Sequence, residues 1–224
     1  MAVLKIKQST IKTIIFDFDG TLAKLNIDFQ KMREAITSLI YSYGIAKDQL
    51  HTDFVLEMIN SAFEILNQIS ERHAKKFIDE ANATIEKIEI GAAYNGKLFN
   101  RTKELLTSLQ SKEISCGIIT RNCNKAVKIV FPDILTYCPV VICRDDVNKV
   151  KPHPEHISLA LTKLRSSAES TLMIGDHPID IKTGRNAGTL TCGVLTGRCK
   201  QNDFIEAGAD IVLSNASDIL NIIR

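Results

Sequence analysis

The stretch that decides the fold is TIIFDFDGTL, residues 13–22, close to the start of the chain. Its first four residues are β-branched, aromatic or otherwise apolar, which is typical of a strand buried on both faces of a parallel sheet. Asp17, Asp19 and Gly20 follow directly. A sequence of this kind also occurs in surface turns, but the apolar run before it favours the end of a buried strand.

The two carboxylates predict a cation site. In open α/β sheets the carboxyl ends of the strands line the ligand crevice. Asp17 and Asp19 would repel each other there unless positive charge compensates them. A divalent cation with oxygen ligands meets that need.

The rest of the chain alternates between two patterns. Short apolar runs that predict further strands occur at Ile114–Thr120, Val140–Cys143, Thr171–Gly175, Thr191–Leu195 and Ile211–Leu213. Segments with helical spacing lie between or after them, at Leu98–Leu109, Pro154–Leu164, Ile179–Asn186 and Ser217–Ile223. This alternation indicates an α/β fold with a Rossmann-like parallel sheet core.

One region departs from the alternation. Between about Ala23 and Ala93 we find no convincing strand, and apolar residues from Phe29 to Tyr43 fall on one helical stripe. Asp28 is expected to cap that helix and Gly44 to end it. We therefore expect an inserted all-α helical cap over residues 23–93, with residues 1–22 and 94–224 forming the α/β catalytic core.

Three other polar sites follow predicted strands or precede predicted helices. Thr120 ends the second strand, Lys151 stands in KPHPE, and Asp176 and Asp180 belong to GDHPID. Each has a simpler explanation by itself: threonine often ends strands, an isolated lysine is usually solvated, and Asp176 would make a good helix N-cap. Together they supply the hydroxyl, ammonium and acids that phosphoryl transfer through an acyl phosphate requires.

Composition sets the broad class. The 224 residues carry a net charge of only +2, which argues against a dedicated binder of nucleic acid or of membrane surfaces. We see no signal peptide and no apolar run of membrane-spanning length, and therefore expect a cytoplasmic protein. The six cysteines form no CxxC pair, so a zinc site is not expected.

In these motifs the chain resembles the haloacid-dehalogenase-like hydrolases, and most of all their phosphoglycolate-phosphatase-like branch with a helical cap. DFDGTL, Thr120, Lys151 in KPHPE and GDHPID stand in the family's order at ordinary separations. The longer run GDHPIDIKTGRNAG, residues 175–188, follows the family pattern as well. The resemblance covers essentially the whole chain.

The resemblance implies a role for each motif residue. Asp17 would be the nucleophile and would become phosphorylated, while Asp19 would act as general acid and then as general base. Thr120, Lys151 and the neighbours of Thr120 would bind the phosphoryl group. Mg²⁺ would be held by the Asp17 carboxylate, the backbone carbonyl of Asp19 and Asp176, with Asp180 behind these ligands or reaching the ion through water. Magnesium is the expected metal because these ligands are hard oxygens and several waters would remain on the ion. The neighbours in question, Arg121 and Asn122, depart from the Thr-Asn-Lys sequence common in this branch, which puts their side-chain contacts in doubt.

Several alternatives stay open. A phosphomutase shares the same motifs, and a catalytically silent phospho-binding or signalling module would belong to another class. The substrate would be a small phosphorylated metabolite, such as phosphoglycolate, a sugar phosphate or a nucleotide, and the protein would be a monomer or a homodimer. Residues that we expect near the entrance of the site are Lys24, Asn26, Arg33, Arg72 and Lys75. Asn124 is a further candidate to face the site, and His177 is expected at its rim.

Overall fold

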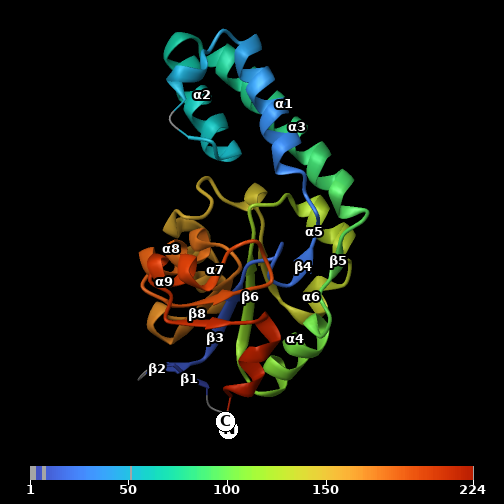
Figure 1. The fold of residues 1–224 in the computed structure, drawn as a ribbon, viewed down its shortest axis with the longest axis vertical. Helices are drawn as coiled ribbons and strands as arrows, with labels where there is room; N and C mark the ends of the chain where they lie inside the picture. Colours follow the sequence, from blue (N-terminus) through green and yellow to red (C-terminus); the bar gives the residue numbers. More distant parts are fainter. Residues whose placement is uncertain (1–3, 7–8, 51, 224) are drawn as a thin grey trace. The chain divides into compact units, whose positions relative to one another are not determined.

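The computed structural model describes residues 4–6, 9–50 and 52–223 (Figure 1). The chain divides into two compact units. One comprises Met1–Leu25 together with Gly96–Arg224 and is called the core unit below. The other, Asn26–Asn95, is called the helical unit.

A six-stranded parallel sheet forms the centre of the core unit, in the order β10-β9-β8-β3-β6-β7. Its strands are β3 (Thr13–Phe16), β6 (Ser115–Ile119), β7 (Val140–Ile142), β8 (Thr171–Gly175), β9 (Leu190–Val194) and β10 (Ile211–Leu213). All six predicted strands are therefore present, and the predicted α/β fold with a parallel sheet is confirmed. The TIIF strand, β3, lies inside the sheet between β6 and β8, and Ile14, Ile15 and Phe16 are fully buried.

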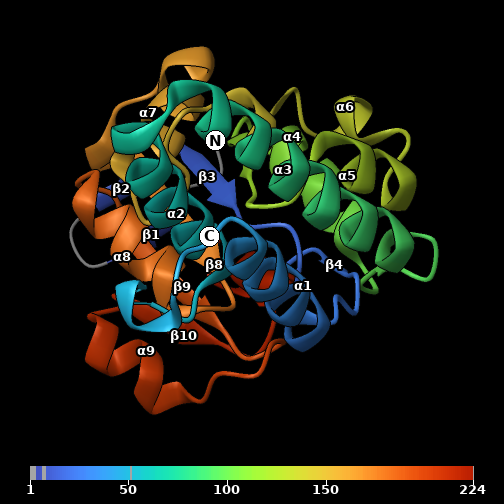
Figure 2. The same cartoon turned by 90° about the horizontal axis from the view of Figure 1, so that it is seen from above.

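Helices cover both faces of this sheet (Figures 1 and 2). The helices of the core unit are α4 (Thr102–Ser111), α5 (Asn124–Val130), α6 (Ile134–Tyr137), α7 (Pro154–Leu164), α8 (Pro178–Asn186) and α9 (Gln201–Ala207). Short 3₁₀ turns occur at η2 (Arg144–Asp146), η3 (Ala168–Ser170) and η4 (Ala216–Asn221). Helix α7 packs on β6 and β7, and α8 packs on β8 and β9, so both follow the parallel strands closely.

Two sequence predictions need correction at their edges. The helix expected over Leu98–Leu109 begins only at Thr102, because Arg101 has the left-handed φ of 68° and Lys97–Leu98 form the short strand β5. The expected helix Ser217–Ile223 is the 3₁₀ segment η4.

Short antiparallel strand pairs were missed altogether. They are β1 (Leu4–Ile6) with β2 (Ser9–Ile11), and β4 (Ala23–Lys24) with β5. The expectation of no strand after Ala23 is therefore wrong at β4. Strands of two or three residues are too short to show an alternating pattern, so only their partners reveal them.

The helical unit consists of α1 (Phe29–Ser42), η1 (Lys47–Gln49), α2 (Val55–Ile69) and α3 (Glu71–Ala93). The predicted caps of α1 are present: Asp28 Oδ1 accepts a hydrogen bond from the backbone of Lys31 at 2.9 Å, and Gly44 follows the helix with a φ of 81°. Helix α3 packs against both α1 and α2. Throughout residues 4–6, 9–50 and 52–223, no helix is both long and apolar enough to cross a membrane.

Candidate active site

Three polar residues follow neighbouring strands at the same edge of the sheet. Asp17 comes after β3, Thr120 after β6 and Asp176 after β8. The register places Phe16 of β3 opposite Ile118 on one side and Ile174 on the other. Because the strands are parallel, their carboxyl ends coincide and the three residues meet at one edge.

Lys151 binds two of the predicted acids. Its Nζ lies 2.5 Å from Asp17 Oδ1 and 2.7 Å from Asp180 Oδ1. The side chains of Lys151, Asp17 and Asp180 are only 3%, 10% and 1% exposed. Carboxylate oxygens of Asp17, Asp176 and Asp180 lie within 4.8 Å of one another. Residues far apart in the sequence therefore form one compact group; Lys151 and Asp17, for example, are 134 positions apart.

The group of Asp17, Asp176, Asp180 and Lys151 carries an excess of negative charge. Burial raises the pKa of Asp17 above its usual value, although the Lys151 ammonium opposes the rise. Burial, together with Asp17 and Asp180, raises the pKa of Asp176 to about 8. Three carboxylates share one ammonium, which leaves two negative charges when all are ionised. A divalent cation would cancel that excess, and three close carboxylate oxygens suit Mg²⁺.

Two glycines shape the place of Asp176. Gly20 has a φ of 91°, and a Cβ on Gly20 or on Gly197 would collide with the Asp176 carboxylate. The Thr21 hydroxyl donates to Asp176 Oδ1 at 3.5 Å. The glycine in DFDGTL therefore serves two purposes, because it allows a left-handed turn and leaves room for an acid from another strand.

Helix α8 is capped by a different residue from the one considered in the sequence. His177 is the N-cap: its Nδ1 accepts from the backbone of Ile179, and Asp180 Oδ2 accepts from the backbone N–H of His177 at 3.1 Å. N-capping by Asp176 is therefore ruled out, because the helix begins only at Pro178. This leaves the Asp176 carboxylate to the acidic group and fixes Asp180 through its second oxygen.

Asp19 has a separate environment. Its Oδ1 accepts a hydrogen bond from the backbone of Leu25 at 2.8 Å, and Asp19 forms an isolated bridge with Ala23. Among the described residues, the close carboxylate group contains Asp17, Asp176 and Asp180, without the Asp19 side chain. The ligand atom expected from Asp19 is its backbone carbonyl oxygen, not a side-chain oxygen.

The residues after β6 are buried or turned toward the Lys151 loop. Thr120 and Asn122 are buried, and the Thr120 hydroxyl accepts from the backbone of Asn122 at 3.2 Å. Arg121 directs its guanidinium elsewhere: Nη1 donates to the backbone carbonyl of Lys151 at 3.2 Å. Asn124 opens α5, and its backbone N–H donates to Asp145 at 2.8 Å.

Sequence reasoning missed His156. This residue of α7 is fully buried and bonds to the backbones of Lys151 and Ile142. Its signal in the sequence is weak, because a histidine on the apolar face of a helix is most often a core residue. Only the contact with Lys151 separates it from that explanation.

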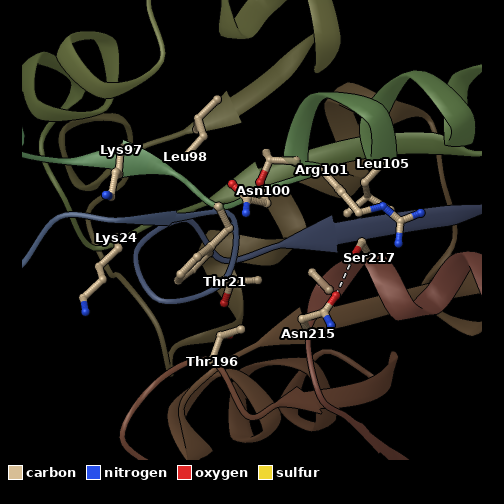
Figure 3. A pocket seen from close by; sticks show the side chains of 13 residues that line it. Thr21, Lys24, Lys97, Leu98, Asn100, Arg101, Leu105, Thr196, Asn215 and Ser217 are labelled. Atoms are coloured by element: carbon tan, nitrogen blue, oxygen red, sulfur yellow. Dashed lines mark hydrogen bonds between the residues drawn. The ribbon is translucent and has the colours of Figure 1, made fainter.

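A cavity of about 520 Å³ is lined in part by Thr21 (Figure 3), the residue whose hydroxyl donates to Asp176. Thr21 and Thr196 contribute hydroxyls to its wall, and Lys24, Lys97 and Arg101 contribute cations. Of the described residues that line it, none is an aspartate or a glutamate, and Asp17 and Lys151 are not among them. The cavity is therefore a neighbour of the carboxylate–lysine group, not its interior.

The residues expected near the entrance are divided between the units. Lys24 belongs to the core unit and lines the cavity, whereas Asn26 begins the helical unit. Arg33, Arg72 and Lys75 are exposed on α1 and α3, and Lys75 pairs with Glu71 at 2.6 Å.

Two pyrophosphatases are similar to this chain over nearly its full length. A pyrophosphatase PpaX from Anoxybacillus flavithermus is 31% identical over 225 residues, which cover 95% of this chain and 97% of that protein. A pyrophosphatase PpaX from Bacillus pumilus is 29% identical over 228 residues, covering 97% and 99%.

Solved structures share the fold. A haloacid dehalogenase-like hydrolase from Bacteroides fragilis has a TM-score of 0.65 at 25% identity and covers 93% of this chain and 99% of its own. A β-phosphoglucomutase from Thermotoga maritima has a TM-score of 0.58 at 21% identity, with 95% and 98% covered, and speaks only for the fold.

A family model described as haloacid dehalogenase-like hydrolase matches residues 14–194. That range contains β3 except for Thr13, the acids that follow β3, the helical unit, Thr120, Lys151 and both acids of GDHPID. The chain therefore belongs to the haloacid dehalogenase-like hydrolase family and is an enzyme of its phosphatase group.

Proposed function

We propose that this protein is a Mg²⁺-dependent phosphatase that hydrolyses a small phosphoester through a phosphorylated Asp17. The observation that carries the proposal is the buried Lys151 ammonium between Asp17 and Asp180, beside the carboxylate of Asp176. A lysine held against a carboxylate at the end of a central strand suits a nucleophile whose charge must be controlled while a phosphoryl group approaches.

The ion would be held by Asp17, Asp176 and Asp180, with Asp19 contributing its backbone carbonyl. When bound, Mg²⁺ would neutralise charge on the phosphoryl oxygens and on the carboxylates. Nucleophilic attack, proton transfer and binding of the phosphoryl oxygens would be carried out by the protein's own side chains.

The reaction would proceed in two displacements. In the first, an oxygen of Asp17 forms a bond to phosphorus, the bond to the leaving oxygen breaks, and Asp19 gives that oxygen a proton. In the second, Asp19 takes a proton from water, the water oxygen attacks phosphorus, and the Asp17–phosphorus bond breaks to release phosphate. Lys151 would stabilise negative charge throughout, and Thr120 would donate its hydroxyl hydrogen to a phosphoryl oxygen.

The helical unit would serve as a cap that supplies substrate contacts and excludes bulk water from the core unit. Its compactness as a separate unit, residues Asn26–Asn95, supports this role. We further propose that the same displacement at phosphorus extends to a phosphoanhydride, with inorganic pyrophosphate as a leading substrate candidate, because pyrophosphatases are found at 28–31% identity over nearly the whole chain. Phosphoglycolate, sugar phosphates and nucleoside monophosphates are the comparison substrates.

The test is a substrate panel with and without Mg²⁺. Purified protein is assayed on p-nitrophenyl phosphate, pyrophosphate and the comparison substrates, and acid-quenched samples are searched by mass spectrometry for phosphate on Asp17. We expect Mg²⁺-dependent release of phosphate and a modified peptide containing Asp17. Inactivity on every substrate with Mg²⁺ present, or a modification at another residue, would refute the proposal.

A further inference from the structure

His156 connects two loops of the site. It is the third residue of α7 and is fully buried. Its Nδ1 accepts a hydrogen bond from the backbone N–H of Lys151 at 3.2 Å, and its Nε2 lies 3.0 Å from the carbonyl oxygen of Ile142 at the end of β7.

The two partners fix the form of the imidazole. A backbone N–H can only donate, so Nδ1 carries no proton, and a carbonyl can only accept, so Nε2 carries one. Burial, with the Lys151 charge nearby, lowers the pKa of His156 to about 4. The ring is therefore neutral at physiological pH and adds no charge to the site.

The hydrogen bonds continue into a closed circuit. The Ile142 carbonyl that binds His156 also accepts from the backbone N–H of Thr120 at 3.0 Å. From the next residue, Arg121 Nη1 donates to the carbonyl of Lys151. Both backbone polar groups of Lys151 are thus bound by side chains. The bond through His156 and Ile142 connects Lys151 to Thr120, and the other bond connects it to Arg121, the residue after Thr120.

The circuit matters because a lysine side chain is long and flexible. The Lys151 ammonium reaches Asp17 and Asp180 over four rotatable bonds. The position of the ammonium therefore depends on the position of the Lys151 backbone. The segment around Lys151 lies outside the strands and helices. Bonds at its N–H and at its carbonyl are what tie it to the ends of β6 and β7.

We propose that His156 and Arg121 are positioning residues that hold Lys151 in register with Thr120, so that ammonium and hydroxyl meet the same phosphoryl group. This inference rests on the proposed phosphatase function. Neither residue touches substrate through these bonds; both act through Lys151.

A double-mutant cycle tests it. His156→Leu removes both bonds at similar volume, and we expect kcat to fall roughly 10- to 100-fold, since small misplacements of a reacting group cost about that much. KM should change less than about threefold. In a Lys151→Met background, His156→Leu should have almost no further effect on kcat, because the group that it positions is gone. Equal losses in both backgrounds would overturn the inference.

Conservative variants separate the two bonds. Asn can place an oxygen near Nδ1 and accept from Lys151, whereas Gln can place its amide nitrogen near Nε2 and donate to Ile142. We expect His156→Asn to recover most of the kcat that His156→Leu loses and His156→Gln to recover little. If kcat instead follows only the melting temperature across the three variants, His156 is structural and the inference fails.

Two further measurements keep the outcome clear. If His156→Leu does not fold, Arg121→Met, at a partly exposed position, takes its place in the same cycle, with the same expectation and the same refuting result. The ¹⁵N NMR shifts of the imidazole should show a protonated Nε2 and a bare Nδ1 without any substrate; the other tautomer would contradict the circuit. An inactive wild-type protein with the expected tautomer would instead count against the proposed function.

Discussion

Two ion pairs of nearly equal length occur in opposite surroundings. Lys151 and Asp180 in the core unit are 2.7 Å apart, with side chains 3% and 1% exposed. Lys75 and Glu71 in the helical unit are 2.6 Å apart, with side chains 70% and 72% exposed. The distance alone therefore says little. Burial decides what happens when one partner is lost: a buried partner keeps an uncompensated charge away from water, whereas an exposed partner is simply solvated.

The comparison also indicates where the chemistry resides. The side chains of Lys151, Asp17, Asp176 and Asp180 in the core unit are packed together in spite of the cost of burial, and burial raises the pKa values of Asp17 and Asp176. Perturbed acids that are held in place are typical of functional sites. Lys75 and Glu71 of the helical unit instead lie in water.

The largest effect should come from the proposed nucleophile, Asp17. Asp17→Asn replaces the attacking oxygen by a group that cannot form the phosphorylated intermediate, so we expect phosphate release to fall at least about 10³-fold. The matched control is Asp79→Asn, the same change at an exposed position of α3, which should keep activity within about twofold. Steady-state assays of both proteins, with circular dichroism to verify folding, check this. Near-normal turnover by Asp17→Asn would show that another residue attacks.

Lys151→Met should reduce both activity and stability. It leaves Asp17 and Asp180 buried without their counter-ion, and breaking a buried pair in this way costs about 3–5 kcal/mol. Urea denaturation in the absence of metal measures the loss of unfolding free energy. Lys75→Met is the control, and we expect no measurable change there. Similar urea midpoints for Lys151→Met and Lys75→Met would show that buried and exposed ion pairs contribute equally to stability in this protein.

Metal binding should depend on the acidic group alone. We expect Mg²⁺ to raise the melting temperature of the wild type, since an ion that binds only the folded state stabilises it by about 2.7 kcal/mol at a concentration 100 times its Kd. Asp176→Asn should lose most of this increase, whereas Asp79→Asn should keep it. Thermal scans over a Mg²⁺ series decide the point. An undiminished increase in the Asp176 variant would place the ion elsewhere.

A smaller effect concerns pH. The pKa of His156 is lowered from 6.5 to about 4, so between these values the unfolded chain binds a proton that the folded protein does not. The free energy of unfolding should therefore fall as the pH drops through this window, by up to about 3 kcal/mol, and His156's contribution should be fully present above it. Urea denaturation at several pH values measures the slope. His156→Asn should show a shallower slope than the wild type, and the exposed control His73→Asn should not.

The sequence predicted the core well for a physical reason. Strands buried on both faces must be apolar throughout, so TIIF, TLMIG and their counterparts were recognisable without any partner. The acids that follow them were found because they interrupt such runs. Asp17 and Asp176 are both of this kind, and the parallel sheet brings them together.

Other features depend on partners that no local pattern reveals. β4 has two residues and exists only through β5. The sequence suggested Asp176 as a possible N-cap of α8, but the N-cap is His177, because the helix begins only at Pro178. His156 is separated from Ile142 by 14 positions, and its bond to the Ile142 carbonyl arises only when α7 packs on β7. Such contacts come from tertiary packing, so the sequence alone cannot supply them.

The smallest effect sharpens the opening comparison from its other side. Glu71→Gln removes one charge of the exposed pair in α3 and leaves Lys75 in water, where solvent replaces the lost partner. We therefore expect no measurable change in the melting temperature at physiological salt. The measurement should be repeated at low salt, because screening weakens surface pairs and a small decrease could emerge there. A large decrease at both salt concentrations would mean that Glu71 and Lys75 belong to a buried network in the folded protein, and exposure would then be a poor guide to the worth of an ion pair in this chain.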